Sequence, residues 1–113
     1  MNLPESAAQR QLEAYNARDI NAFCEAYTSD VELINLLTGE VFCSGIDQMR
    51  QRYGEQFERC TELHCEVSKR IVCGNVVIDE EQVSGLVEGQ SVHATAIYEV
   101  REGFIARGWF VRE

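Results

Sequence analysis

Apolar side chains recur at intervals of three and four in the first half of the chain, which is the spacing of amphipathic helices. This spacing predicts a first helix that begins after Pro4 and ends near Arg18, and a second that begins at the N-cap Asp19 and ends near Ser29. A third helix is predicted over residues 46–60. Between the last two helices, residues 31–37 and 41–43 are predicted to pair as a short hairpin.

From Leu63 onward apolar positions alternate with polar ones, which is the spacing of strands with one buried face. Four strands joined by short glycine-containing turns are predicted, over residues 63–73, 76–87, 91–101 and 104–112. Strands joined in this way form an antiparallel meander. Helices followed by such strands predict a single α+β domain over residues 1–113, in which the helices pack on one face of a curved sheet.

The charge of the chain excludes some classes of partner. The formal net charge is −9, because 19 acidic residues oppose 10 basic ones. The negative electrostatic potential of such a chain repels the phosphates of nucleic acids and the headgroups of anionic lipids. No apolar run is long enough to span a bilayer, and residues 1–5 lack the basic and apolar regions of a signal peptide. We therefore expect a cytoplasmic protein with no nucleic-acid and no membrane partner.

The chain contains five cysteines without a C-x-x-C pair: Cys24, Cys43, Cys60, Cys65 and Cys73. An odd number in a chain without an export signal favours free, buried thiols over a disulfide framework. A zinc site would need Cys60, His64 and Cys65, but the last two are adjacent and point to opposite faces of a strand. We therefore expect no metal site.

Three sequence segments carry a family resemblance. The first helix ends in Tyr-Asn-Ala-Arg-Asp at 15–19, Tyr-Thr-Ser-Asp-Val-Glu follows at 27–32, and Ser-Gly-Ile at 44–46 opens the third helix. The chain closes with Ala-Ile-Tyr-Glu-Val-Arg-Glu-Gly-Phe-Ile at 96–105. Over essentially its whole length it resembles the nuclear-transport-factor-2-like superfamily, in its SnoaL-like or steroid delta-isomerase-like branch.

The resemblance implies a cystatin-like cone, in which a curved antiparallel sheet wraps around the N-terminal helices and leaves an apolar pocket. Members of the superfamily include ketosteroid isomerases, polyketide cyclases, dehydratases, epoxide hydrolases and non-catalytic binding proteins. The fold therefore does not choose an activity.

Ketosteroid isomerases of this superfamily use an aspartate base, a tyrosine and a protonated aspartate. The resemblance places Gln11 at the tyrosine position, Asn35 at the base position and Ala96 at or near the position of the protonated acid. Asparagine cannot abstract a proton, and alanine cannot donate a hydrogen bond to an enolate. We therefore expect the chain not to be a standard ketosteroid isomerase.

Two other residues, Glu80 and Tyr98, are the candidates for catalysis. Odd-numbered and even-numbered residues of the strand at 76–87 lie on opposite faces, and parity alone does not say which face is inside. The resemblance places Glu80 toward the pocket, where a desolvated carboxyl can act as acid or base; the alternative is a solvated charge in an acidic run. Tyr98 shares an apolar face with Ala96, so its hydroxyl either points into the cone or is bonded locally in the core.

Four further side chains are predicted to bind the ligand: Tyr15, Asn35, Tyr53 and Trp109. The three aromatic rings are expected to line the pocket, although packing in an ordinary hydrophobic core explains their spacing equally well. Asn35 either orients a ligand carbonyl or caps the hairpin. His64 and His93 lie on the less apolar faces of their strands and are expected to be exposed or interfacial.

These features predict a pocket for a small apolar ligand. The leading hypothesis is an isomerase, dehydratase or cyclase that uses acid-base chemistry on a carbonyl-containing substrate and needs no cofactor. The alternative is a non-catalytic ligand-binding or protein-association module, which the lost acid-base residues at two of the three family positions favour.

The sheet face opposite the helices is predicted to be apolar as well. The strand residues that alternate with those facing the helices, and so lie on this outer face, include Val77, Val83, Ile97, Ile105, Trp109 and Val111. This is too much apolar area for the solvated surface of a monomer. We therefore expect a homodimer through the outer sheet face.

Overall fold

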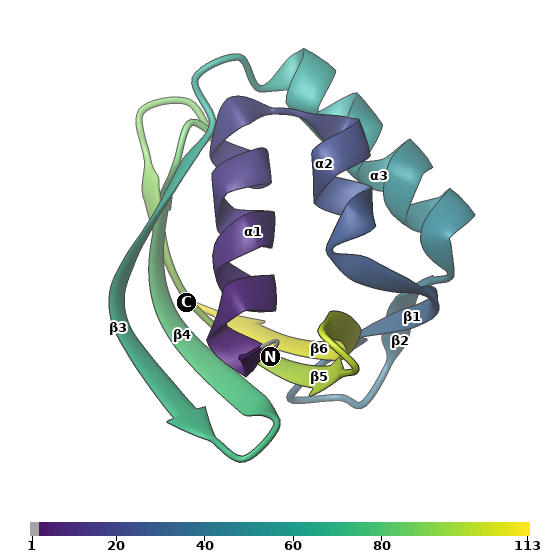
Figure 1. Cartoon of the computed structure of the whole chain (residues 1–113). Helices are drawn as coiled ribbons and strands as arrows, with labels where there is room; N and C mark the ends of the chain where they lie inside the picture. The colour runs from purple at the N-terminus through teal and green to yellow at the C-terminus, as the bar shows by residue number, and fades with distance from the viewer. Residues whose placement is uncertain (1–2) are drawn as a thin grey trace.

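The computed structural model describes residues 3–113, and within them the chain forms three helices and six strands (Figure 1). The helices are α1 (Pro4–Ala17), α2 (Ile20–Glu25) and α3 (Ile46–Arg59). The strands are β1 (Tyr27–Asn35), β2 (Val41–Ser44), β3 (His64–Cys73), β4 (Val76–Ser84), β5 (Ser91–Arg101) and β6 (Phe104–Arg112). No helix of this part of the chain is both long enough and apolar enough to cross a membrane.

One sheet contains all these strands, in the order β2-β1-β6-β5-β4-β3. Strands β3 to β6 form the predicted antiparallel meander. Strand β1 lies parallel to β6, and β2 pairs antiparallel with β1. The sheet is curved and does not close, and α1 lies in its hollow with α2 and α3 beside it (Figure 1). The predicted α+β class, with a curved sheet around the N-terminal helices, is confirmed.

Local chemistry sets the boundary between α1 and α2. Pro4 occupies the first turn of α1, where its missing amide donor is not needed. Arg18 ends α1 in the left-handed conformation, with φ of 52°, and its amide bonds back to carbonyls of the last turn. Asp19 then caps α2, because its side chain accepts a hydrogen bond of 3.1 Å from the amide of Ala22.

Helix α2 is shorter than the helical spacing predicts, since it ends at Glu25 rather than near Ser29. Tyr27 already belongs to β1 and is paired with Ile105 of β6. The amide of Ile105 also donates a hydrogen bond of 2.9 Å to the carbonyl of Ala26. Pairing with a strand from the far end of the chain therefore overrides the local helical pattern.

A bulge in β3 changes the face on which its side chains lie. The register against β4 shifts between Val67 and Lys69, which leaves Ser68 without a paired residue. An extra residue reverses the alternation, so Cys65 before the bulge is buried and Cys73 after it is exposed. The prediction that all five cysteines are buried is therefore wrong for Cys73, although the other four are buried and free.

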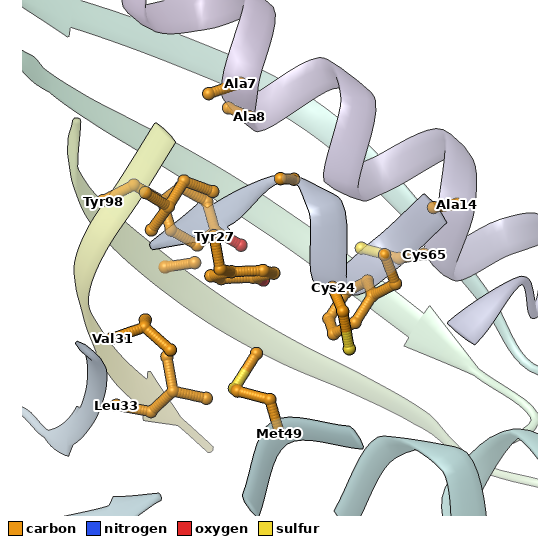
Figure 2. Packing of buried hydrophobic residues seen from close by; sticks show 14 of the residues in the cluster. Ala7, Ala8, Ala14, Cys24, Tyr27, Val31, Leu33, Met49, Cys65 and Tyr98 are labelled. Carbon is orange, nitrogen blue, oxygen red and sulfur yellow. The ribbon is translucent and has the colours of Figure 1, made fainter. Parts of the chain in front are cut away.

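The core lies between α1 and the concave face of the sheet. Ala7, Ala8 and Ala14 are buried on the side of α1 that faces it, and their small side chains let the helix approach the sheet closely (Figure 2). Around Phe23 four rings lie with centroids 4.9–6.0 Å from its own, those of Tyr15, Tyr27, Tyr53 and Phe57. All rings of this cluster except that of Phe57 line the cavity described next.

Candidate functional site: a cavity inside the cone

A cavity of about 450 Å³ lies between the concave face of the sheet and helices α1 and α3. Small-molecule sites typically occupy roughly 300–1,000 Å³. Buried side chains line its inner end: Gln11, Phe23, Tyr27, Cys65, Glu81 and Tyr98. Its outer end, called the mouth below, is lined by five exposed side chains: Asn35, Leu37, Glu40, Arg52 and Arg112. The cavity thus has a closed end that contains an acid and an open end that contains charges.

Glu81 of β4 is the titratable carboxyl at the inner end, and only 8% of its surface is exposed. Burial raises its pKa from 4.5 to about 7, and the nearby carboxylate of Asp79 adds to the rise. The thiol of Cys65 and the guanidinium of Arg70 lower the pKa and only partly offset this effect. Glu81 therefore exchanges its proton near neutral pH, as a general acid or base must.

Asp79 is fully buried and forms an ion pair with Arg70, its directly opposite residue on β3. Nε and Nη2 of Arg70 donate to the two carboxylate oxygens at 2.7 and 3.0 Å. Nη1 of Arg70 donates to Oε1 of Gln9 on α1 at 3.0 Å. This bidentate pair neutralises the charge of Asp79 and fixes its position near Glu81.

Three tyrosines line the inner part of the cavity. The hydroxyl of Tyr27 donates to Oε1 of Gln11 at 3.5 Å, and that of Tyr15 donates to Oε1 of Gln56 at 3.3 Å. The hydroxyl of Tyr98 has no hydrogen-bond partner among residues 3–113. Burial raises the pKa of all three phenols above 10, so they remain protonated donors. Tyr98 is therefore available to donate to a ligand oxygen.

Glu80, the carboxyl that the sequence favours for catalysis, lies on the other face of β4 and does not line the cavity. Its Oε2 is 2.9 Å from Nε2 of His93, and its Oε1 accepts a hydrogen bond of 3.2 Å from Ser68. These contacts lower its pKa. The predicted placement of Glu80 in the pocket is wrong, because the odd-numbered residues of β4 are the buried ones.

Trp109 also lies on the outer face, opposite Ile97 in the register of β5 and β6, and does not line the cavity. The prediction that it forms pocket wall is wrong by one position. Phe110 supplies the aromatic wall instead, with its ring centroid 6.0 Å from that of Tyr98. Side chains of successive strand residues point to opposite faces, so this single step moves the ring from one side of the sheet to the other.

The apolar residues predicted for the outer face divide between the two faces. Val77, Val83 and Ile105 are buried in the core, so their predicted placement is wrong. Val111 lies opposite Thr95, which lies opposite Glu80, so the register places it on the outer face as predicted, although it also borders the cavity. The outer face instead carries a row of residues that are opposite one another across five strands: Ile71, Ile78, Ile97, Trp109 and Ile34. We call this set the outer row.

Tyr15, Asn35, Tyr53 and Tyr98 all line the cavity. Burial raises the pKa of Tyr53 to about 12. Oδ1 of Asn35 accepts hydrogen bonds of 3.0 and 3.2 Å from the amides that follow it at 37 and 38. Of the two roles expected for Asn35, the structure therefore shows the cap of the hairpin turn.

The sequence singles out neither Glu81, which lines the cavity, nor its buried neighbour Asp79, although the predicted hairpin contains a signal for both. A two-residue turn at 88–89 pairs odd-numbered residues of one strand with even-numbered residues of the next. If Ala96 and Tyr98 face inward, Asp79 and Glu81 must lie on the same side. The observed pairing of Asp79 with Ala96 has this parity.

The cavity has the groups needed for proton transfer. Within residues 3–113 no three His, Cys, Asp or Glu side chains converge as ligands of a metal ion. The inner end combines the titratable carboxyl of Glu81 with the phenol of Tyr98 and aromatic walls. Such a set can move a proton to or from carbon while a neutral donor stabilises a developing oxyanion.

Comparison with known proteins agrees with the fold. An uncharacterised cystatin-fold protein from Novosphingobium aromaticivorans is 24% identical, has a TM-score of 0.88, and the match covers 99% of each chain. A protein from Jannaschia sp. CCS1 assigned as a SnoaL-like polyketide cyclase is 16% identical with a TM-score of 0.78, covering 97% of this chain and 85% of that one.

A protein with a ketosteroid isomerase-like fold from Catenulispora acidiphila, solved in complex with trimethylamine, is 16% identical. Its TM-score is 0.79, and the match covers 93% of this chain and 83% of that one. At these identities the likeness concerns the fold alone. No curated protein matches the chain. The SnoaL-like domain family, however, matches residues 8–108. This match spans most of the chain and agrees with the sequence resemblance, so the protein belongs to the SnoaL-like domain family.

Proposed function

We propose that the protein is a cofactor-independent acid-base enzyme that acts on a largely apolar, carbonyl-containing small molecule, with Glu81 as its proton-transfer group. The observation that carries this proposal is a carboxyl buried in a cavity of about 450 Å³ with a pKa of about 7. At neutral pH such a group is present in both protonation states. It can therefore accept a proton in one step and return it in the next.

In the proposed reaction the carboxylate of Glu81 removes a proton from the carbon next to the substrate carbonyl. The electrons of the broken C–H bond form the C=C bond of an enolate, and negative charge develops on the carbonyl oxygen. The hydroxyl of Tyr98, which has no partner within residues 3–113, donates a hydrogen bond to that oxygen. Protonated Glu81 then returns the proton either to another carbon, which isomerises the substrate, or to a leaving hydroxyl, which releases water.

The position of the proposed base differs from that of ketosteroid isomerases. At the corresponding position on β1, Asn35 has no titratable group and its Oδ1 already accepts two backbone amides. The proposed base is instead on β4, which β6 and β5 separate from β1 in the sheet. We therefore expect the protein to isomerise simple 3-ketosteroids at no more than trace rates.

Exchange of carbon-bound protons tests the proposal without knowledge of the natural substrate. NMR in D₂O follows the loss of α-protons from a small apolar ketone such as 2-tetralone. The wild type should accelerate this exchange, and Glu81→Gln and Tyr98→Phe should each lower the acceleration about a hundredfold, the usual contribution of one acid-base group or oxyanion donor.

Glu80→Gln is the matched control, because it makes the same chemical change one residue away and outside the cavity. It should leave the exchange rate unchanged. Thermal unfolding of each variant establishes that the fold is retained. Binding of 2-tetralone without accelerated exchange would instead support the alternative class, a non-catalytic ligand-binding module. An equal loss of activity in Glu80→Gln would show that the assignment to Glu81 is wrong.

A further inference from the structure

The mouth of the cavity differs chemically from its inner end. Leu37 and Glu40 line it from the β1–β2 hairpin, Arg52 lines it from α3, and Arg112 lines it at the end of β6. Two guanidinium groups and one carboxylate leave the mouth with an excess of positive charge, although the chain as a whole has a net charge of −9. Electrostatics at the mouth therefore favours an anion.

Arg52 rests on an aromatic surface that belongs to the cavity wall. Its guanidinium carbon lies 4.8 Å from the centroid of the Phe42 ring. Phe42 in turn packs edge-on against Phe110, with ring centroids 5.9 Å apart, and both rings line the cavity. A guanidinium over a ring face is held in position while the N–H donors at its edge remain available.

Neither Arg52 nor Arg112 forms an ion pair with a carboxylate in the described part of the chain. By contrast Arg70, Arg101 and Arg107 each have an Asp or Glu oxygen at 2.7–3.9 Å. Guanidinium groups with unused donors bind carboxylates well, because their planar donor geometry matches two oxygens at once.

We propose that the ligand of the cavity is an amphipathic carboxylic acid, whose carboxylate binds Arg52 and Arg112 at the mouth while its apolar body lies against Phe42 and Phe110. This inference rests on the proposed function, because the reacting carbonyl is assigned to the inner end near Glu81. The substrate class is then an oxo or unsaturated acid with an apolar middle. A neutral steroid has no anionic group that could bind the two arginines of the mouth.

Two fluorescent probes with one aromatic body separate the contribution of the anion. The first, 1-anilinonaphthalene-8-sulfonate, carries an anionic group, and the second, N-phenyl-1-naphthylamine, is the same skeleton without it. The wild type should bind the anionic probe about tenfold more tightly, since a charge-assisted hydrogen bond contributes roughly that factor. Arg52→Gln and Arg112→Gln should weaken binding of the anionic probe fivefold to tenfold. Neither variant should change binding of the neutral probe.

Arg59→Gln is the matched control, because Arg59 is also an exposed arginine of α3 but does not line the cavity. It should leave binding of both probes unchanged. Equal affinity of the wild type for the two probes, or equal losses in Arg59→Gln and Arg52→Gln, would overturn the inference while the acid-base role of Glu81 stands. Failure of both probes to bind would overturn the inference together with the ligand cavity on which the proposed function depends.

Discussion

Glu80 and Glu81 are adjacent residues of one strand and have the same side chain, but their environments are opposite. Glu80 lies on the outer face, where contacts with His93 and Ser68 lower its pKa. Glu81 lies on the inner face, where burial and Asp79 raise its pKa to about 7. The comparison shows that the face of the sheet, and not the residue type, decides whether a carboxyl in this acidic run is a solvated charge or a candidate base.

The same division applies to the ion pairs on the two faces. On the inner face Arg70 and the fully buried Asp79 are bound in a bidentate pair with contacts of 2.7 and 3.0 Å. On the outer face Arg107 lies 3.9 Å from Glu32 and 3.8 Å from Glu99, and all three side chains are well exposed. Solvent screens the outer pairs and leaves the inner pair strong.

The largest expected effect comes from breaking the inner pair. Arg70→Met leaves the carboxylate of Asp79 buried without a partner, and we expect the free energy of unfolding to fall by about 3 kcal/mol. Arg107→Met, the outer-face control, should change it little. Urea denaturation of both variants measures the difference. Equal losses in the two variants would contradict the division between the faces.

The next effect is a pH-dependent change in stability from Glu81. Its pKa is about 7 in the folded protein against an ordinary value of 4.5, so between these values the unfolded chain ionises while the folded protein keeps the proton. Stability therefore falls as pH rises through this window. Glu81→Gln removes this pH-dependent loss of stability. The variant should be up to about 3 kcal/mol more stable than the wild type at about pH 8, and its stability should nearly equal that of the wild type at about pH 4.

Denaturation of Glu80→Gln over the same pH range is the control for that experiment. The pKa of Glu80 is lowered, so this variant gains no stability at high pH. A gain of similar size in both variants, or a gain of Glu81→Gln that does not depend on pH, would contradict the proposed burial of a titratable carboxyl.

A further effect concerns assembly through the outer face. We propose that the outer row, which includes Trp109, forms the contact in a homodimer, because a stripe of five apolar residues across five strands is otherwise left partly exposed to water. Sedimentation equilibrium should give about twice the chain mass of 12.8 kDa at micromolar concentration. Trp109→Glu should shift the protein to monomer, since a buried tryptophan at an interface typically contributes about 2 kcal/mol. A monomeric wild type would refute the assembly.

The smallest expected effect comes from His93 on the outer face. Nδ1 and Nε2 of His93 lie 3.0 and 2.9 Å from carboxylates of Glu113 and Glu80, and these contacts raise its pKa. The protonated ring then stabilises the folded protein below about pH 6.5, and this contribution is lost as pH rises through the raised value. The melting temperature of the wild type should exceed that of His93→Gln slightly at low pH, and the two should converge at high pH.

The sequence was a good guide to the elements and a poorer guide to the faces. The bounds of helices α1 and α3 and of strands β3 to β6 lie close to those that the apolar periods predict, because each period is a property of one segment. The parallel pairing of β1 with β6 depends on residues far apart in the chain and leaves no local signal.

The faces of the strands depend on single residues. The unpaired Ser68 reverses the alternation of β3, and nothing in its immediate sequence marks it as a bulge. The apolar neighbours of Tyr98 on one face of its strand indicate that it faces the interior, and of the two placements that this leaves open, Tyr98 lines the cavity. The family resemblance favours Glu80 over Glu81, and the run at 79–81 is acidic on both faces, so composition does not correct that choice. Only the pairing with β5 distinguishes the two carboxyls.

The most direct test of the account is the pKa of Glu81 itself. Carbon-13 NMR of the side-chain carboxyls, compared between wild type and Glu81→Gln, identifies its resonance and follows its titration. We predict a midpoint near 7, with Glu80, assigned in the same way from Glu80→Gln, titrating below its ordinary value of 4.5. A midpoint for Glu81 near 4.5 would contradict the central claim, because it would mean that the carboxyl is solvated and cannot exchange a proton at neutral pH.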